Sequence, residues 1–107
     1  MFYAGWIADY PHPQDFLDVL FHSGAENNYG DYSNPEIDTL LEKAAIEPNS
    51  NLNLALYQQA ERKLVEDAAC LSLWFGKTLI LVKPAVKGYN LSPQGLIMLN
   101  SVSIEPD

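Results

Sequence analysis

The sequence has little cysteine, few basic residues and no long apolar run. Its only cysteine is Cys70, so no disulfide can form within the chain, and its apolar neighbours predict a small buried side chain. Six Lys and Arg residues against fourteen Asp and Glu residues give a net charge of -8. This balance argues against nucleic-acid binding, because phosphate contacts need clustered cations. The longest apolar stretches, such as 71–75 and 78–82, are too short to span a bilayer.

The patterns typical of enzymes are missing as well. The glycines are scattered rather than gathered in a phosphate-binding loop, and no nucleophile elbow is present. A metal site built from His12, Asp15 and His22 is conceivable, but two surface histidines explain the pattern more simply. Asp9, Asp15 and Asp18 fall on different predicted elements and support a carboxylate pair for acid–base chemistry only weakly. We therefore predict no catalytic residues, no metal and no cofactor.

Length and composition favour one small folded unit. With 107 residues the chain is one domain at most, and 48% hydrophobic residues exclude a disordered or low-complexity segment. The first residues lack both a basic stretch and an apolar stretch, so we predict no signal peptide in this chain.

The order of elements predicts a mixed α/β structure. Helices are expected at 14–22, from Pro35 onward with Asn34 as its cap, and at 52–68. Strands are expected at 2–8, 71–75 and 78–83, with a loop at 84–95 and a last extended pair at 96–99 and 101–104.

Two apolar stripes predict the helical core. The first has the spacing of one helix face, and the second repeats every four residues and is widened by Tyr57 and Val65. The first stripe consists of Ile37, Leu40, Leu41, Ala44 and Ala45, and the second of Leu52, Leu56, Ala60, Leu64 and Ala68.

The run Gly5-Trp6-Ile7-Ala8-Asp9-Tyr10-Pro11-His12-Pro13 is the strongest candidate for a binding site. Apolar residues that run into a proline-flanked loop are typical of a strand that delivers side chains to a rim. A rim with Trp6, Asp9 and Tyr10 can stack on a ligand and hold a cation or an amine.

Several segments together resemble one family along nearly the whole chain. They are Gly5-Trp6-Ile7-Ala8-Asp9-Tyr10-Pro11, 16–17 with 20–21, 28–32, 34–38 with 40–41, 56–61, 64–68, and 81–84 with 86–89. In this order and spacing the chain resembles the C-terminal part of the family 5 extracellular solute-binding proteins. These are the oligopeptide- and dipeptide-binding proteins of ABC importers.

The resemblance implies a fold, a location and partners. Residues 1–76 are expected to form part of the C-terminal lobe of a type II periplasmic-binding-protein fold, and residues 77–107 to cross back toward the N-terminal lobe. The resemblance implies a parent protein that is periplasmic or extracellular, or a cell-surface lipoprotein, and that passes a peptide to a membrane permease. Because the chain resembles about the last fifth of such a protein, we expect it to bind little alone and to self-associate through uncovered apolar strands.

The resemblance also implies site residues. The carboxylate of Asp9 is expected to receive the α-ammonium group of a peptide, Trp6 to line side-chain pockets, and Phe75 and Gly76 to approach the ligand. Structural roles remain open: Trp6 could pack in the core, Asp9 could cap the following helix or anchor the proline turn, and Tyr10 could pack against that turn.

The sequence departs from the family at four positions. Family members often have an acidic residue or Asn where His12 stands, Pro where Cys70 and Ser72 stand, and an aromatic residue where Gly76 stands. The first departure alters the rim, the next two affect entry to the 71–75 strand, and the last leaves more room for a ligand. Alternatives are a binding protein for another solute, such as an oligosaccharide or nickel chelate, and a hydrolase with an unrecognised site.

Overall fold

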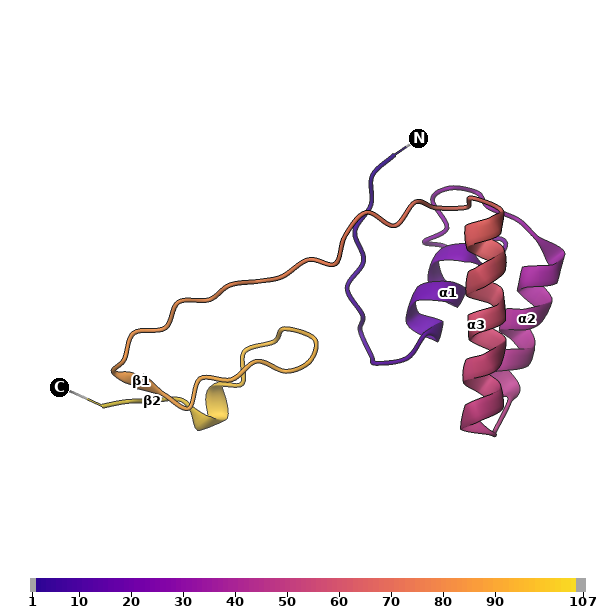
Figure 1. The fold of residues 1–107 in the computed structure, drawn as a ribbon. Coiled ribbons are helices and arrows are strands. Elements are labelled where there is room, and N and C mark those ends of the chain that lie inside the picture. The colour runs from indigo at the N-terminus through magenta and orange to yellow at the C-terminus, as the bar shows by residue number, and fades with distance from the viewer. Residues whose placement is uncertain (1, 106–107) are drawn as a thin grey trace. The chain divides into compact units, whose positions relative to one another are not determined.

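The computed structural model describes residues 2–105, which divide into two units, the first ending at Ser72 and the second beginning at Leu73. The first unit contains α1 (Gln14–Phe21), α2 (Pro35–Ile46) and α3 (Ser50–Glu66) (Figure 1). The second contains β1 (Val86–Lys87), the short 3-10 helix η1 (Leu99–Ser101) and β2 (Ser103–Ile104). The mixed α/β class is therefore confirmed, and none of the helices in 2–105 has the length and apolar character needed to cross a membrane.

Side-chain caps set where α2 and α3 begin. Asn34 Oδ1 accepts a hydrogen bond from the Glu36 backbone N–H at 3.0 Å, and Pro35 occupies the first helical position, which confirms the predicted start of α2. Asn49 Oδ1 accepts from the N–H groups of Asn51 and Leu52, so α3 begins at Ser50, earlier than predicted.

The end of α3 also differs from the prediction. Ala68 has a left-handed backbone with φ of 51°, and the Ala69 N–H donates to the Leu64 carbonyl at 3.0 Å. This closing turn ends α3 at Glu66, two residues before the predicted end at Ala68.

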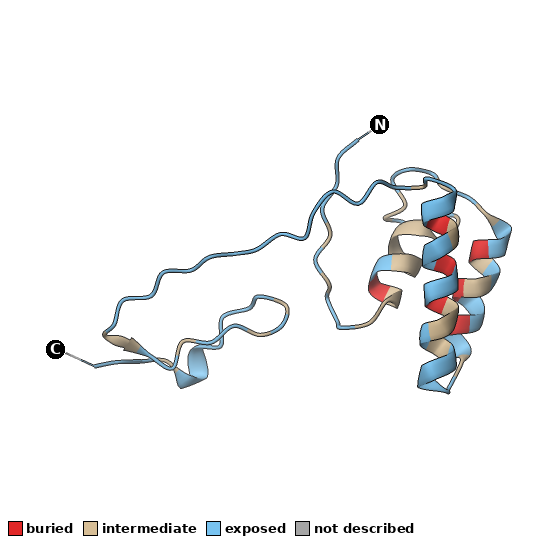
Figure 2. Cartoon of the chain, viewed as in Figure 1, coloured by how far each residue is buried: buried red, intermediate tan, exposed pale blue. Residues whose placement is uncertain are grey.

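The core of the first unit lies between α2 and α3, with α1 packed against both (Figure 2). Its fully buried apolar residues are Ile37, Leu41, Ala44, Tyr57, Ala60 and Leu64. Leu17 and Phe21 of α1 are partly buried against this cluster. The core is thus built from residues of both predicted stripes, together with Tyr57.

The edges of the predicted stripes are wrong, since Ala45, Leu52, Val65 and Ala68 are exposed. An interval of four residues advances about 400° around a helix with 3.6 residues per turn, so such a row drifts by about 40° at each step. Leu52, at the start of the row, is carried away from α2 by this drift, whereas Ala68 lies beyond the end of α3 in a left-handed conformation. The middle of the row, Ala60 and Leu64, remains buried.

The three predicted strands at 2–8, 71–75 and 78–83 are not strands in the structure. They lack ladder hydrogen bonds, and nearly all their residues are exposed; only Trp6 and Ala8 are partly covered. A strand needs a neighbouring strand that pairs with its backbone, and no such ladder forms along these three segments. Cys70, predicted to be buried, is exposed for the same reason.

In the second unit, β2 pairs with β1 rather than with 96–99. The antiparallel register places Val86 opposite Ile104 and Lys87 opposite Ser103. The predicted pair of 96–99 with 101–104 is therefore wrong, and β1 falls in a segment predicted as loop. The turn depends on Gly88, whose φ is 68° and where an added Cβ would lie 1.9 Å from the Ser101 carbonyl oxygen.

We expect Leu41→Ala to destabilise the first unit by about 2–5 kcal/mol, because it opens a cavity between α2 and α3. Ile46→Ala, on the same helix at a site 83% exposed, should change the free energy of unfolding by less than about 0.5 kcal/mol. Urea unfolding followed by far-ultraviolet circular dichroism measures both. Equal effects of the two substitutions would contradict the α2–α3 core.

Candidate functional site

The loop from Asp9 to Phe16 is held by a dense set of hydrogen bonds. The His12 N–H donates to the Tyr10 carbonyl at 2.8 Å, and the N–H groups of Asp15 and Phe16 donate to the carbonyls of His12 and Pro13. The Gln14 N–H donates to His12 Nδ1 at 3.2 Å. Pro11 and Pro13 have no N–H to satisfy, so few backbone donors in this loop remain unpaired.

His12 also connects this loop to the helical core. Its ring meets the buried ring of Tyr57 on α3 edge to face, with centroids 5.4 Å apart. The position where the family often has an acidic residue is thus occupied by a side chain that both closes the loop and packs on α3.

Asp15 is the one charged residue of the described chain that is buried, with 2% of its surface exposed. It lies in the first turn of α1, where the helix dipole favours a negative charge. Its Oδ2 atom accepts a hydrogen bond of 2.7 Å from the backbone N–H of Asp9, six residues earlier. The carboxylate that anchors the loop is therefore Asp15, while Asp9 contributes its backbone N–H.

The three predicted contacts of the first unit have different exposures. Asp9 is exposed and Tyr10 is 40% exposed, whereas Trp6 is half-buried and its indole N–H is enclosed without a hydrogen-bond partner among residues 2–105. Asp9 does not cap α1, because the N-cap residue of this helix is Pro13 and the first helical N–H, that of Gln14, donates to His12 Nδ1. That structural alternative for Asp9 is wrong.

The phenol of Tyr10 lies in the electric field of several carboxylates of this loop and of α1. Partial burial raises the pKa of the Tyr10 phenol, and the charges of Asp15, Asp18 and Asp9 raise it further. Three carboxylates thus act on one phenol, although the sequence placed them on different elements. This electrostatic environment favours a positively charged group such as an ammonium.

Asp18 and Tyr57 form a second polar contact beneath this cluster. Burial raises the pKa of the Asp18 carboxyl, although Tyr57, His22 and His12 act in the opposite direction. Burial also raises the pKa of the Tyr57 hydroxyl, and Asp18 adds to the shift. Asp18 Oδ2 and the Tyr57 hydroxyl are both buried, and neither makes a hydrogen bond of good geometry among the described residues.

His22 lies at the other end of α1 and serves the packing of α1 on α2. Burial lowers its pKa, but the Ser23 carbonyl and the carboxylates of Asp38 and Glu42 outweigh this effect and raise the pKa. The Ser23 N–H donates to Asp38 Oδ1 at 2.9 Å in the same contact. Within the described part of the chain, no three His, Cys, Asp or Glu side chains meet to hold a metal ion, so the structure does not assemble the set His12, Asp15 and His22.

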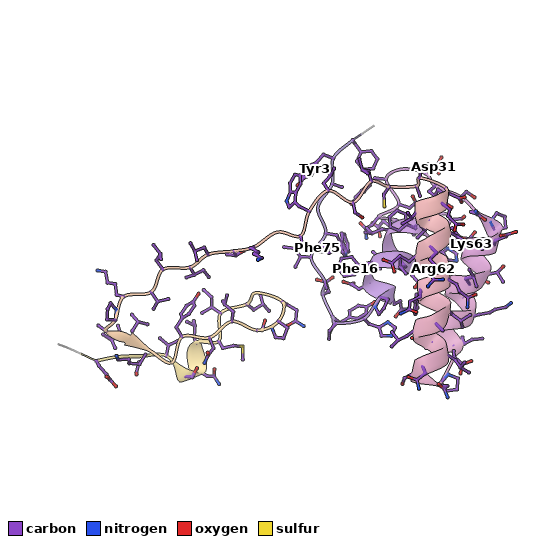
Figure 3. All side chains as sticks on the ribbon, viewed as in Figure 1. Tyr3, Phe16, Asp31, Arg62, Lys63 and Phe75 are labelled. Carbon is purple, nitrogen blue, oxygen red and sulfur yellow. The ribbon has the colours of Figure 1, made fainter. Side chains whose placement is uncertain are left out.

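Phe75 and Gly76, the other predicted contacts, belong to the second unit. The Phe75 side chain is 98% exposed (Figure 3), and an added Cβ at Gly76 would meet open space. The role of Phe75 and Gly76 at the ligand, and their joint role with Asp9, stay predictions.

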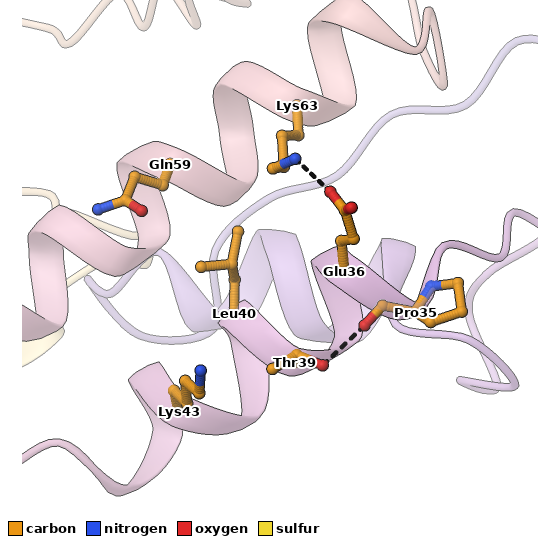
Figure 4. Close-up of a pocket in the computed structure, with 7 residues that line it drawn as sticks. All are labelled: Pro35, Glu36, Thr39, Leu40, Lys43, Gln59 and Lys63. Atoms are coloured by element: carbon orange, nitrogen blue, oxygen red, sulfur yellow. Dashed lines mark hydrogen bonds and ion pairs between the residues drawn. The ribbon is translucent and has the colours of Figure 1, made fainter.

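A surface hollow of about 500 Å³ lies between α2 and α3, away from the predicted contacts (Figure 4). Leu40 and Gln59 line it, and the ion pair of Lys63 with Glu36 crosses it. The basic side chains near it are partly neutralised by Glu36, and none of its residues was predicted to bind ligand. We therefore place the candidate site at the Asp9 loop, where charge and geometry agree.

Sequence reasoning missed the role of Asp15, which it treated only as a weak metal or acid–base candidate. A signal was present in the sequence. An acidic residue in the first turn of a helix often reaches back to an N–H before the helix, and here Pro11 and Pro13 remove the nearer donors.

Comparison with known proteins places the chain among solute-binding proteins, although no family model matches it. It is 35% identical over 86 residues to the periplasmic oligopeptide-binding protein OppA of Salmonella typhimurium, covering 80% of this chain and 16% of that protein. It is 30% identical over 96 residues to the dipeptide-binding protein DppE of Bacillus subtilis, covering 90% of this chain and 18% of that protein.

A third relative is named for a different ligand. The chain is 32% identical over 101 residues to the probable deoxycholate-binding periplasmic protein YgiS of Escherichia coli, covering 94% of this chain and 19% of that protein. The chain thus spans less than a fifth of the length of these curated relatives, which are named as binding proteins rather than enzymes.

We expect Asp18→Asn to stabilise the first unit at neutral pH. Because the folded structure raises the pKa of Asp18, its stabilising contribution is present below the unfolded pKa of about 3.9 and is lost as pH rises through the folded pKa. The gain should stay below about 1 kcal/mol, since solvent screens this half-exposed carboxyl. Urea unfolding at pH 3 and pH 7 measures it.

Asp31→Asn is the matched control for this prediction. Asp31 is exposed and has a left-handed φ of 49°, which Asn also tolerates, so the substitution should have little effect at either pH. An equal gain from Asp31→Asn would mean that the lower net charge of the chain stabilises the fold, rather than removal of the partly buried Asp18 carboxylate.

Proposed function

Because the chain is a relative of the family 5 extracellular solute-binding proteins over less than a fifth of their length, we propose that it contributes to the peptide-binding component of an ABC importer. The observation that carries this proposal is the exposed Asp9, held on a hydrogen-bonded loop beside two further carboxylates. In the complete protein the peptide would be enclosed between two lobes and passed to a membrane permease. The relatives named as periplasmic support that location for it.

In this proposal Asp9 receives the α-ammonium group of the peptide. A charge-assisted hydrogen bond is strong where water is excluded, and the negative charge around Tyr10 adds to the attraction. The half-buried Trp6 and the phenol of Tyr10 supply apolar surface beside the carboxylate. Phe75 and Gly76 would complete the pocket, with residues 1–76 in one lobe and 77–107 returning toward the other.

A second candidate is a binding protein for another solute. The similarity to a probable deoxycholate-binding protein favours this alternative, because deoxycholate is not a peptide. A solute without an ammonium group has no need of the Asp9 carboxylate. The two candidates therefore differ in how binding responds when the charge of Asp9 is removed.

We expect Asp9→Asn to weaken binding of trialanine by about 1.5–3 kcal/mol, the range for a hydrogen bond to a charged group. Binding of N-acetyl-trialanine, which has no ammonium group, should be weak and unchanged by the substitution. Nuclear magnetic resonance titration of the labelled 107-residue chain at millimolar peptide suits the weak binding expected of this segment.

Asp31→Asn serves as the control, since it removes a carboxylate from an exposed position on a different loop. It should leave trialanine binding as it is. If Asp9→Asn has no effect on trialanine, or if both peptides bind equally, the ammonium role of Asp9 is wrong. Binding of deoxycholate but of neither peptide would favour the second candidate.

We also propose that the chain self-associates through residues 78–82. Leu79 and Leu81 are 88% and 91% exposed, and no ladder hydrogen bond covers this extended segment. A second copy that pairs with this segment would satisfy its backbone and cover its side chains together.

We expect the double variant Leu79→Lys/Leu81→Lys to shift the chain toward monomer in sedimentation velocity at about physiological ionic strength. Ile46→Lys adds a charge at another exposed apolar site, 83% exposed, and should not change the association. A wild-type chain that stays monomeric up to millimolar concentration would refute this association.

A further inference from the structure

We propose that Asp15 is a positioning residue, which fixes the place of the Asp9 carboxylate by holding the Asp9 backbone. This inference rests on the proposed function, because it assigns a role in the same site. Its basis is the 2.7 Å hydrogen bond from the Asp9 N–H to Asp15 Oδ2 and the burial of Asp15 to 2% exposure.

A buried carboxylate is costly to keep without a partner, and a backbone N–H is a strong one. Asp15 lies at the second position of α1, two residues after the N-cap residue Pro13. A side chain at this end of a helix can reach back to satisfy an N–H before the helix. Pro13 and Pro11 have no N–H, and the N–H groups of Gln14 and His12 already donate within the loop, so Asp15 instead accepts from Asp9.

The rest of the loop leaves little freedom for Asp9. His12 closes the turn through its backbone and its ring, and its ring also rests on Tyr57 in the core. Asp15 itself is anchored by α1, which packs on α2 and α3. Asp15 and His12 therefore connect the helical core to the loop that carries Asp9, while Asp9 itself remains exposed.

Position is the main contribution of Asp15 in this proposal, and its negative charge adds the smaller part of the attraction. Asp15→Asn keeps an acceptor oxygen in the same place and removes the charge. Asp15→Glu keeps the charge and lengthens the side chain by one methylene, which displaces the Asp9 backbone. The two substitutions therefore separate position from charge, and both keep a polar partner for the Asp9 N–H.

The experiment measures two properties of the labelled 107-residue chain, amide hydrogen exchange at Asp9 and affinity for trialanine. We expect slow amide exchange at Asp9 in the wild type and in Asp15→Asn. The trialanine affinities of these two proteins should differ by less than about threefold. We expect Asp15→Glu to weaken trialanine binding by about tenfold, comparable to loss of one hydrogen bond to a charged group. Affinity for N-acetyl-trialanine should not change.

Two further variants exclude a merely structural role. Asp38→Glu perturbs an equivalent carboxylate, which accepts a 2.9 Å hydrogen bond from the Ser23 N–H away from the loop, and should leave trialanine affinity unchanged. The double variant Asp9→Asn/Asp15→Glu should bind trialanine no more weakly than Asp9→Asn alone, because Asp15 acts through Asp9.

The outcomes distinguish this inference from the proposed function. If the wild type binds trialanine but Asp15→Asn loses affinity and Asp15→Glu keeps it, charge rather than position matters and the inference is overturned. Fast exchange at Asp9 in the wild type overturns it as well. If the wild type binds neither peptide, the proposed function fails for this chain, and a protected Asp9 amide then marks Asp15 as a loop anchor without a positioning role.

Discussion

The packing of α2 against α3 is the contact on which the rest of the first unit depends. Most of the stability of helices in proteins comes from packing of one face, and here α2 and α3 bury their apolar faces against each other. Ile37 and Leu41 from one helix and Tyr57 and Leu64 from the other are almost fully enclosed. α1 has its place because Leu17 and Phe21 pack against this pair.

Two contacts hold the candidate site against that core. In the first, Asp15 in the first turn of α1 accepts a hydrogen bond from the Asp9 backbone N–H. In the second, the His12 ring contacts the buried ring of Tyr57. Tyr57 therefore belongs to both the core and the support of the site, and its hydroxyl faces Asp18 within the same cluster of charge.

The second unit follows a different principle. Among its described residues, strand pairing is limited to the two-residue ladder of β1 and β2 and the isolated antiparallel bridge of Leu91 with Ile97, and its apolar side chains at 79, 81 and 104 remain largely exposed. A two-stranded ribbon of this size is at most marginally stable in water by itself. A third strand, or packing against a helix, is needed before such a ribbon becomes stable.

The sequence by itself determined the helices and the family. Asn34 and Pro35 mark a helix start through local hydrogen bonding, and the stripe around Leu41 and Leu64 marks the buried faces, because both signals act within a few residues. The same local reasoning failed for the strands, since residues 2–8 and 71–83 are apolar enough for strands but form no β-ladder in the described structure. Only the tertiary structure decided that Asp15 rather than Asp9 anchors the loop, because that choice depends on which carboxylate is buried and which N–H the prolines leave within its reach.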